Sequence, residues 1–164
     1  MNRSILIGLL CALLTGCSTA QAFLGTSVIS TGDGDTLHVR QNGQDVTVRL
    51  ACIDAPERRQ PGGQFASDRL RQLLPVGRRV QLRTVETDRY GRTVGEVYAN
   101  GRSINLQLVT EGQAVVYPQY LSGCQDDRDA YLQAEQAARR ARRGFWSQRN
   151  PVMPWDWRRQ QRSS

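Results

Sequence analysis

The sequence predicts an α+β domain, mainly β, in which about five short strands close a small barrel and three helices pack on it. Three observations support this fold class. Short segments that alternate apolar and polar residues recur between turn-forming residues, which is typical of antiparallel strands. Apolar residues at helical spacing occur once after the third strand and twice after the fifth. The length of 164 residues and the apolar content of 39% suit one domain with a modest core.

The five expected strands are separated by recognisable turns. The first two lie on either side of the turn Gly32-Asp33-Gly34, and Asn42-Gly43 is a strong hairpin signal before the third. A turn around Tyr90-Gly91 joins the last two strands. The expected ranges are 27–30, 36–40, 45–53, 79–85 and 93–98.

Three helices are expected, over 66–74, 103–111 and 126–143. The first places Ala66 and Leu70 on one face and ends at Pro75. Ser103 can cap the second, and Gly112 can end it. Aspartates begin the third and arginines end it, as the helix dipole prefers. We therefore divide the chain into a leader region (1–22), a barrel domain (23–147) and a Trp- and Arg-rich tail (148–164) that its tryptophans partly order.

The first 22 residues have the features of an export signal. Arg3 precedes an apolar run over 5–14 that is too short to anchor the chain across a membrane. Leu14-Thr15-Gly16-Cys17 resembles a bacterial lipobox, in which Cys17 becomes the acylated N-terminus. Ala20-Gln21-Ala22 offers an alternative, ordinary cleavage after Ala22, which would give a freely secreted protein. We expect an exported protein, anchored to the outer membrane or cell surface through Cys17 rather than freely secreted.

Cysteine usage agrees with export. Cys11 and Cys17 belong to the leader, which leaves Cys52 and Cys124 in the folded part. An even pair in an oxidising compartment is a disulfide candidate, and two separate buried thiols are the alternative. A bridge would close a loop of roughly 70 residues. By restricting the unfolded chain, it would stabilise the fold by about 4 kcal/mol.

The basic residues exclude several kinds of chemistry. All 22 of them are arginine, and the formal net charge is +7. Without lysine there is no P-loop lysine, no Schiff base and no Ser/Lys dyad. A single histidine, His38, and the lack of any C-x-x-C pair exclude the common zinc sites. Because arginine binds phosphate in a bidentate manner, an arginine-only basic protein indicates a nucleic acid or another polyanion as partner.

Three segments carry groups that could do chemistry: 33–36, 49–57 and 88–93. Each alone also suits a polar turn or a surface ion pair. Together they supply carboxylates and backbone carbonyls, a hard-oxygen set suited to Ca²⁺ or Mg²⁺. Their arginines could stabilise an anionic phosphate, and a further carboxylate could orient or deprotonate a water molecule. The combination indicates metal-assisted phosphodiester hydrolysis.

These segments resemble, in order and spacing, the staphylococcal nuclease (thermonuclease) family. The motifs are Asp33-Gly34-Asp35-Thr36, the stretch from Arg49 to Asp54-Ala55-Pro56-Glu57, and Asp88-Arg89-Tyr90-Gly91-Arg92. The resemblance covers roughly 28–146. It implies a five-stranded OB-type barrel with three helices. It also implies calcium-dependent hydrolysis of DNA and RNA with little sequence specificity, a preference for single strands and 3′-phosphate products. A monomer is the default expectation.

The resemblance implies a metal site and a base. Asp35, Asp54 and the backbone carbonyl of Ala55 would bind Ca²⁺, with Asp33 as a nearby carboxylate beyond the direct ligands. Thr is common in the family where this chain has Ala55, but a carbonyl ligand is kept with any side chain. Glu57 would hold the attacking water and is the candidate general base.

The resemblance also implies substrate contacts. Arg49 and Arg92 would clamp the phosphate and stabilise its developing charge. Tyr90, Tyr117 and Tyr120 would lie near the nucleotide.

Two other function classes remain to be weighed. A non-catalytic OB-type module could bind single-stranded nucleic acid without cutting it, and a structural lipoprotein could bind a surface polyanion. Neither needs the acidic residues of the motifs together with the arginine pair. Carboxylates beside a phosphate groove weaken binding unless a metal neutralises them. The sequence therefore favours the enzyme.

Overall fold

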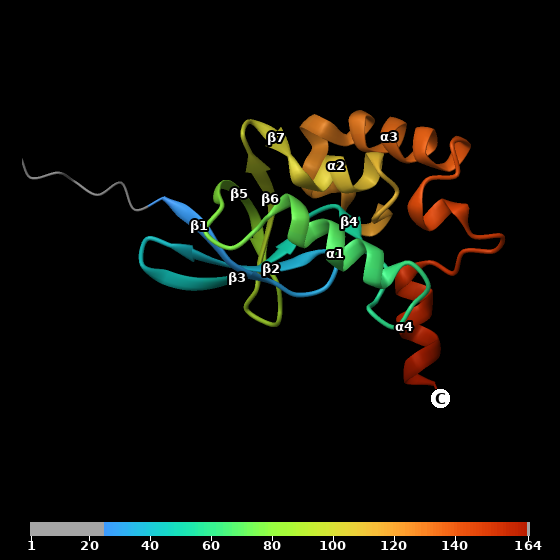
Figure 1. The fold of residues 1–164 in the computed structure, drawn as a ribbon, viewed down its shortest axis with the longest axis horizontal. Helices are drawn as coiled ribbons and strands as arrows, with labels where there is room; N and C mark the ends of the chain where they lie inside the picture. Colours follow the sequence, from blue (N-terminus) through green and yellow to red (C-terminus); the bar gives the residue numbers. More distant parts are fainter. Residues whose placement is uncertain (1–24, 164) are drawn as a thin grey trace, which may run out of the picture.

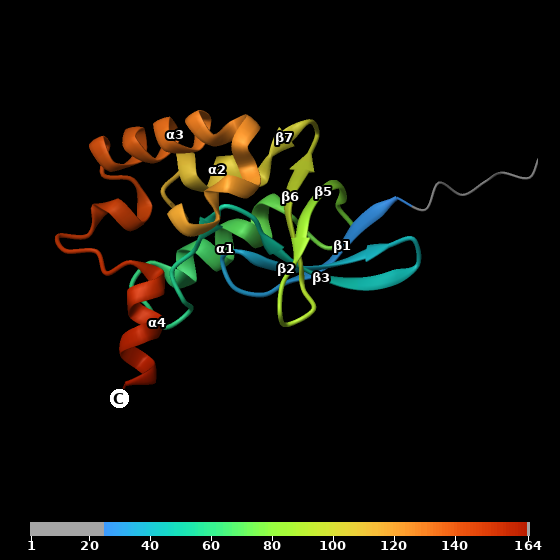
Figure 2. The ribbon, with the colours of Figure 1, turned by 180° about the vertical axis from the view of Figure 1, so that it is seen from behind.

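The computed structural model describes residues 25–163, so the predicted leader, including Cys17, lies outside the described residues. The chain forms a β-barrel with helices on it (Figures 1 and 2). The longer strands are β1 (Thr26–Thr31), β2 (Thr36–Gln41), β3 (Gln44–Leu50), β5 (Arg79–Thr87) and β6 (Thr93–Ala99). The shorter ones are β4 (Ile53–Asp54), β7 (Arg102–Ser103) and β8 (Val115–Val116).

Five strands close the barrel in the order β3-β2-β1-β5-β6. Neighbours along this order are antiparallel, and a parallel pairing of β3 with β6 closes the ring. The predicted OB-type barrel is thereby confirmed. Alternation explains which side chains fill it, because Leu37 and Val39 of β2 and Val48 and Leu50 of β3 all point inward and are buried.

The helices are α1 (Gly63–Leu73), α2 (Ile104–Thr110), α3 (Arg128–Arg140) and α4 (Pro154–Arg162), with 3₁₀ segments η1 (Pro118–Asp127) and η2 (Gly144–Ser147). The first three are the predicted helices. Ser103 caps α2 as expected, since its hydroxyl oxygen accepts a hydrogen bond from the backbone N–H of Leu106. The fourth helix lies in the segment expected to be a tail. None of these helices is long and apolar enough to cross a membrane.

The helices take different places around the barrel (Figures 1 and 2). The pair α2 and α3 packs together on one side, and α1 crosses nearer the middle. Helix α4 lies at the end of the molecule away from the tip of the β2–β3 hairpin, next to the loop that joins β4 to α1. That loop carries Glu57, so the last helix lies beside a predicted catalytic residue.

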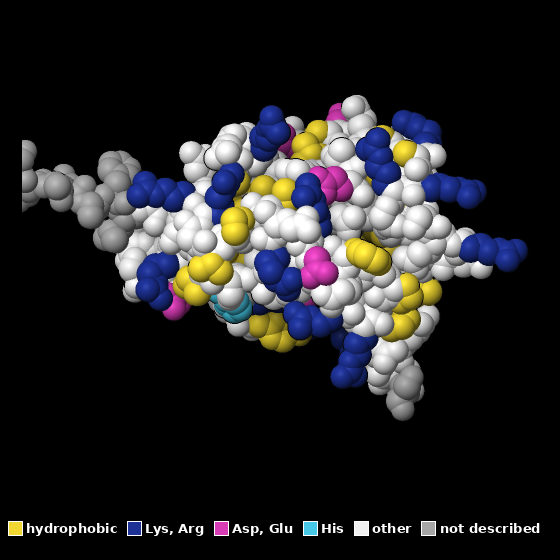
Figure 3. All heavy atoms as spheres, viewed as in Figure 1, with side chains coloured by type: hydrophobic (Ala, Val, Ile, Leu, Met, Phe, Trp, Pro, Cys, Tyr) yellow, Lys and Arg dark blue, Asp and Glu magenta, His cyan; other side chains and the backbone are white. Residues whose placement is uncertain are grey.

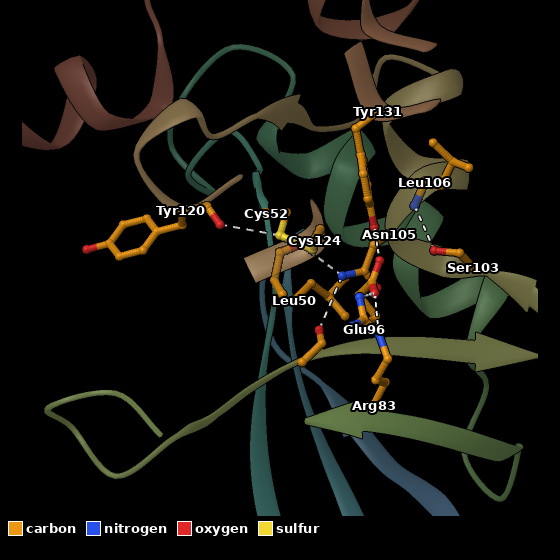
Figure 4. The surroundings of a disulfide bond; sticks show 12 residues. Leu50, Cys52, Arg83, Glu96, Ser103, Asn105, Leu106, Tyr120, Cys124 and Tyr131 are labelled. Carbon is orange, nitrogen blue, oxygen red and sulfur yellow. Dashed lines mark hydrogen bonds and ion pairs between the residues drawn. A yellow bond between two sulfur atoms is a disulfide. The ribbon is translucent and has the colours of Figure 1, made fainter. Parts of the chain in front are cut away.

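The third expected strand, 45–53, is interrupted by a turn. Cys52 has a positive φ of 66°, which ends the extended backbone between β3 and β4. Its sulfur is bonded to that of Cys124 in η1, with the two Cα atoms 6.3 Å apart, so the predicted disulfide is confirmed (Figure 4). The turn and the bridge together set the direction in which the chain enters the segment 53–57.

Candidate active site

A tight turn between β1 and β2 delivers Asp35 to the site. The backbone N–H of Gly32 donates to the carbonyl of Thr36 (2.8 Å), and the carbonyl of Asp35 accepts from the N–H of Leu50 (2.8 Å). Gly34 lies so close to its neighbours that an added Cβ would be 2.7 Å from the Cβ of Ala55. Glycine at this position therefore lets the turn pack directly against the segment that carries Asp54.

Asp54 comes from the short strand β4, which pairs with β8. Its side chain is fully buried. Arg49 at the end of β3 joins the two acids, since its Nη1 lies 2.9 Å from Oδ2 of Asp35 and its Nη2 lies 2.9 Å from Oδ1 of Asp54. The backbone N–H of Ala55 also donates to Oδ2 of Asp35 (2.7 Å). Two carboxylates, an arginine and the Ala55 backbone thus form one hydrogen-bonded cluster.

The cluster is rich in buried acid. Burial raises the pKa of Asp35 to about 7, and the negative charges of Asp33 and Asp54 act in the same direction. The Arg49 guanidinium and the Ala55 N–H partly oppose the rise in the pKa. Oδ1 of Asp33 is buried without a hydrogen-bond partner among the described residues. Such a set of hard oxygens fits a calcium ion, whose charge would offset the mutual repulsion of the acids.

Glu57 follows the cluster across Pro56 and is more exposed, with a third of its side chain (34%) accessible. Buried Gln60 fixes its backbone, because the Glu57 N–H donates to Oε1 of Gln60 (3.1 Å) and the Gln60 N–H donates to the Glu57 carbonyl (2.7 Å). A Cβ at Gly63 would collide with that carbonyl, so only glycine lets α1 begin this close to Glu57. The candidate base is therefore on a rigid turn, with its side chain partly exposed to solvent.

Arg158 of α4 completes the cluster and was missed by the sequence analysis. It binds Asp54 in a bidentate manner and also contacts Glu57. The local helix could have been found, because Pro154 occupies its first turn, Asp156 follows there, and arginines lie in its last turn. Its docking onto Asp54, 104 residues away, has no local signal.

Comparison with known proteins agrees with this geometry. A family model described as staphylococcal nuclease homologue matches residues 47–148, which is more than half of the chain.

The chain belongs to the staphylococcal nuclease family.

Individual relatives support the same family. A protein named micrococcal nuclease from Shigella flexneri is 45% identical over 136 residues, 77% of this chain and 76% of the relative. One named uncharacterized endonuclease from Escherichia coli O157:H7 is 41% identical over 132 residues, 80% of this chain and 82% of its own length. A third, Protein ParB of Escherichia coli, is 39% identical over 158 residues, 91% of this chain and 87% of the relative. As a staphylococcal-nuclease-family nuclease, the chain is a phosphodiesterase.

The second predicted arginine of this nuclease, Arg92, lies apart from the carboxylate cluster. Its Nε is 2.8 Å from Oδ2 of Asp88, and its guanidinium lies 5.6 Å from the centre of the Tyr90 ring. Its neighbour Thr93 pairs with Val48 across the parallel β3–β6 contact, so Arg92 directly precedes the strand beside the one that carries Arg49. Among the described residues, the arrangement seen for Arg92 is an ion pair within its own turn.

The predicted nucleotide contacts of this nuclease fall in two places. Tyr90 is 68% exposed on the β5–β6 turn. Tyr117 and Tyr120 lie together at the start of η1, with ring centres 4.9 Å apart, and the N–H of Tyr117 donates to the carbonyl of Cys52 (2.9 Å). Tyr117 is stacked against Trp155 of α4 with ring centres 5.2 Å apart. The fourth helix thus covers one predicted nucleotide contact as well as the acids.

Residues 25–163 contain no group of three or more His, Cys, Asp or Glu side chains arranged to hold a metal ion. Guanidinium groups occupy the relevant oxygens instead, since Arg49 bridges Asp35 and Asp54 while Arg158 bridges Asp54 and Glu57. The ligand set that the family resemblance implies for a cation includes both of these buried carboxylates, Asp35 and Asp54.

Proposed function

We propose that the protein is a calcium-dependent nuclease that hydrolyses DNA and RNA with little sequence specificity. The observation that carries the proposal is the pair of buried carboxylates, Asp35 and Asp54, held together by Arg49 with Glu57 at the solvent edge. A module that only binds phosphate gains nothing from buried acids, because they repel its ligand. A hydrolase needs them to hold a cation.

Asp35, Asp54 and the carbonyl of Ala55 would hold the calcium ion, and Asp33 would add negative charge near it. The ion would supply charge stabilisation for a phosphate oxygen and for the attacking water. The protein contributes a rigid donor set, because the turn at Gly34 and the paired strand β4 fix the positions of both acids.

Glu57 would orient the water and accept its proton, since its carboxylate is the exposed one beside the buried pair. Arg49 would bind the phosphate from the same side as the acids. Arg92 would leave Asp88 and bind a second phosphate oxygen, which suits the planar fork of a guanidinium. Negative charge grows on those oxygens in the transition state, so two preorganised arginines would lower the barrier.

The decisive experiment is release of acid-soluble nucleotides from denatured DNA, with Ca²⁺ and then with excess chelator. Wild-type protein should release nucleotides only with Ca²⁺. The variant Glu57→Gln should bind Ca²⁺ but lose turnover by roughly 100-fold or more, because a general base contributes about that much. The control Glu86→Gln alters an exposed carboxylate on β5 and should retain wild-type turnover.

Two outcomes would contradict the proposal. Wild-type turnover in Glu57→Gln would remove this residue from the mechanism. Retention of the strand in a binding assay, with no release under Ca²⁺ or Mg²⁺, would identify the protein as a binding module.

The preference for single strands and the 3′-phosphate products can be tested in the same assay. Denatured DNA should be cut faster than duplex DNA. The products should resist extension by a polymerase until a phosphatase removes the 3′-phosphate. Extension without phosphatase treatment would show that the products end in a 3′-hydroxyl, so that the bond between phosphorus and the 3′ oxygen is the one cleaved.

The protein would act outside the cytoplasm, as a monomer carrying a lipid on Cys17. The lipobox-like sequence before Cys17 supports this proposal. The Cys52–Cys124 disulfide supports it too, since such bonds persist in oxidising compartments. Metabolic labelling with palmitate should mark the wild-type protein and not Cys17→Ser. A soluble, unlabelled wild-type product that begins at Phe23 would instead indicate cleavage after Ala22.

A further inference from the structure

Helix α4 places a positive charge directly on the carboxylates of the site. Nη2 of Arg158 lies 2.7 Å from Oδ2 of Asp54, and its Nη1 lies 3.0 Å from Oδ1 of the same side chain. The same Nη1 lies 2.8 Å from Oε1 of Glu57. Both oxygens of Asp54 therefore face Arg158, and the candidate base is bound by it as well.

The helix that carries Arg158 is attached at further points. Trp155, one turn earlier in α4, is stacked on Tyr117 with the ring planes only 4° from parallel. Ahead of the helix, the carbonyl of Val152 accepts a hydrogen bond of 2.6 Å from the side chain of buried Gln60, the residue that fixes the Glu57 turn. These contacts involve two different segments, the start of η1 and the loop after β4, so α4 is attached at separate points.

We propose that Arg158 and the calcium ion are alternative occupants of Asp54, so that α4 is an autoinhibitory element that must release Arg158 before the cation binds. This inference rests on the proposed calcium-dependent function. It adds a resting state in which one side chain blocks two functions, because Arg158 takes the oxygens that a cation needs and also binds the carboxylate that would orient water.

Electrostatics make the two occupants exclusive. Arg158 and Arg49 together place three donors on the Asp54 carboxylate, which has only about four acceptor positions, and a guanidinium and a divalent ion at this spacing repel each other. The ion pair with Arg158 is partly open to water, with a third (34%) of its side chain exposed. The side chain can therefore leave without opening the barrel.

The surroundings of Arg158 suggest what promotes its release. A hollow beside it lies between α4 and the loop after β4, and it is lined by Glu57, Arg58, Arg59, Trp157, Arg158 and Arg162 among others. When Arg158 leaves Asp54 it joins three other arginines there, which is unfavourable unless an anion is present. A nucleic acid phosphate in this hollow would supply that anion. Substrate and calcium should therefore favour the same open state.

The test is calorimetric titration of Ca²⁺ into residues 23–164 without substrate. Arg158→Ala should bind Ca²⁺ about ten-fold more tightly than wild type, the effect of removing a competing ion pair. The matched control is Arg159→Ala on the same helix, whose side chain is 74% exposed and, within residues 25–163, pairs with Asp156. It should leave the affinity unchanged. Trp155→Ala keeps Arg158 but removes the stack on Tyr117, and it should raise the affinity by a smaller factor.

Wild-type affinity in Arg158→Ala, with the variant folded by circular dichroism, would overturn the proposal. Activity provides a second readout. Arg158→Ala should reach half-maximal turnover at a lower Ca²⁺ concentration, with a maximal rate at least equal to that of wild type. A lower maximal rate at saturating Ca²⁺, with unchanged Ca²⁺ affinity, would show instead that Arg158 binds the substrate and would also overturn the proposal.

Failure of the function and failure of this inference give different results. A wild-type protein without turnover at any Ca²⁺ concentration would refute the proposed nuclease, whereas the titration would still report whether Arg158 excludes the cation. An active wild-type enzyme whose Ca²⁺ affinity does not respond to Arg158→Ala would refute only the autoinhibitory contact.

Discussion

Arg49 shows how one residue makes the site possible. Asp35 and Asp54 are both buried, and two carboxylates that share a site repel each other strongly. The guanidinium of Arg49 lies 2.9 Å from each of them and compensates part of that repulsion in the absence of a cation. The same side chain is then in place to bind a phosphate when a cation takes over the acids.

Arg92 is predicted to act mainly in the transition state. Here it pairs with Asp88, so its contribution must come after it has exchanged that carboxylate for a phosphate. Arg92→Ala should lower kcat/KM. The lost transition-state stabilisation that this fall reports should be about 3 kcal/mol or more, comparable with the loss of one preorganised donor. Initial rates on a short single-stranded oligonucleotide give the value. Arg89→Ala, which removes a neighbouring exposed arginine that contacts Tyr90, should stay near wild type.

The division of the effect between kcat and KM decides the role. A fall in kcat places Arg92 on the charge that develops during the reaction. A rise in KM alone would contradict that role and assign Arg92 to ground-state binding of the substrate.

At the scale of the elements, one buried acid joins helix α3 to the barrel. Glu96 of β6 is fully buried and accepts a hydrogen bond of 2.6 Å from the hydroxyl of Tyr131 in α3 (Figure 4). Its other oxygen is paired with Arg83 of β5. Burial raises the pKa of the Tyr131 phenol, and its hydrogen bond to Glu96 acts in the same direction. The helix is thus held to both strands by a single side chain.

Tyr131→Phe should destabilise the fold by about 1–3 kcal/mol, because it leaves a buried carboxylate oxygen without its donor. Urea unfolding followed by circular dichroism measures the change. Tyr98→Phe is the matched control. The Tyr98 hydroxyl lies 3.3 Å from Oε2 of Glu96, and Arg83 also binds this oxygen, so it keeps a donor in the variant. An equal loss of unfolding free energy in the two variants would contradict a larger contribution from the Tyr131 hydrogen bond.

Many of the strands and helices could be predicted from the sequence. Alternation and the Asn42-Gly43 turn predicted the β2–β3 hairpin, and Ser103 predicted the start of α2, because these signals are local. The break at Cys52 escaped prediction, since a positive φ at a non-glycine residue depends on its surroundings. Helix α3 begins at Arg128, later than expected, because the preceding segment forms η1.

The candidate site also contains residues that the sequence predicts and one that it does not. Asp35, Asp54 and Arg49 were expected together from their motifs, and the barrel brings them into contact. Arg158 was not expected, because nothing in the tail encodes its partner. Its contact with Asp54 depends on where the folded barrel leaves a negative surface, which only the tertiary structure reveals.

For the whole molecule, the charge distribution favours a polyanionic partner. The formal net charge is +7, and every basic residue is an arginine. Arginine side chains are spread over the face in Figure 3, with few carboxylates between them. Such a surface attracts nucleic acid without reading its sequence, and the attraction weakens as salt rises. This attraction is sufficient to explain the broad sequence tolerance that we propose.

The disulfide affects the whole molecule through its unfolded state. It joins residues 72 apart, Cys52 and Cys124, and therefore restricts about half of the described chain. The loop-entropy model gives about 4 kcal/mol of stabilisation, most of which Cys52→Ala with Cys124→Ala should lose in urea unfolding. A protein that begins at residue 23 has no other cysteine, so it should show no titratable thiol when it is denatured without reductant. Two thiols in that titration would contradict the bridge, and unchanged stability in the double variant would contradict its role.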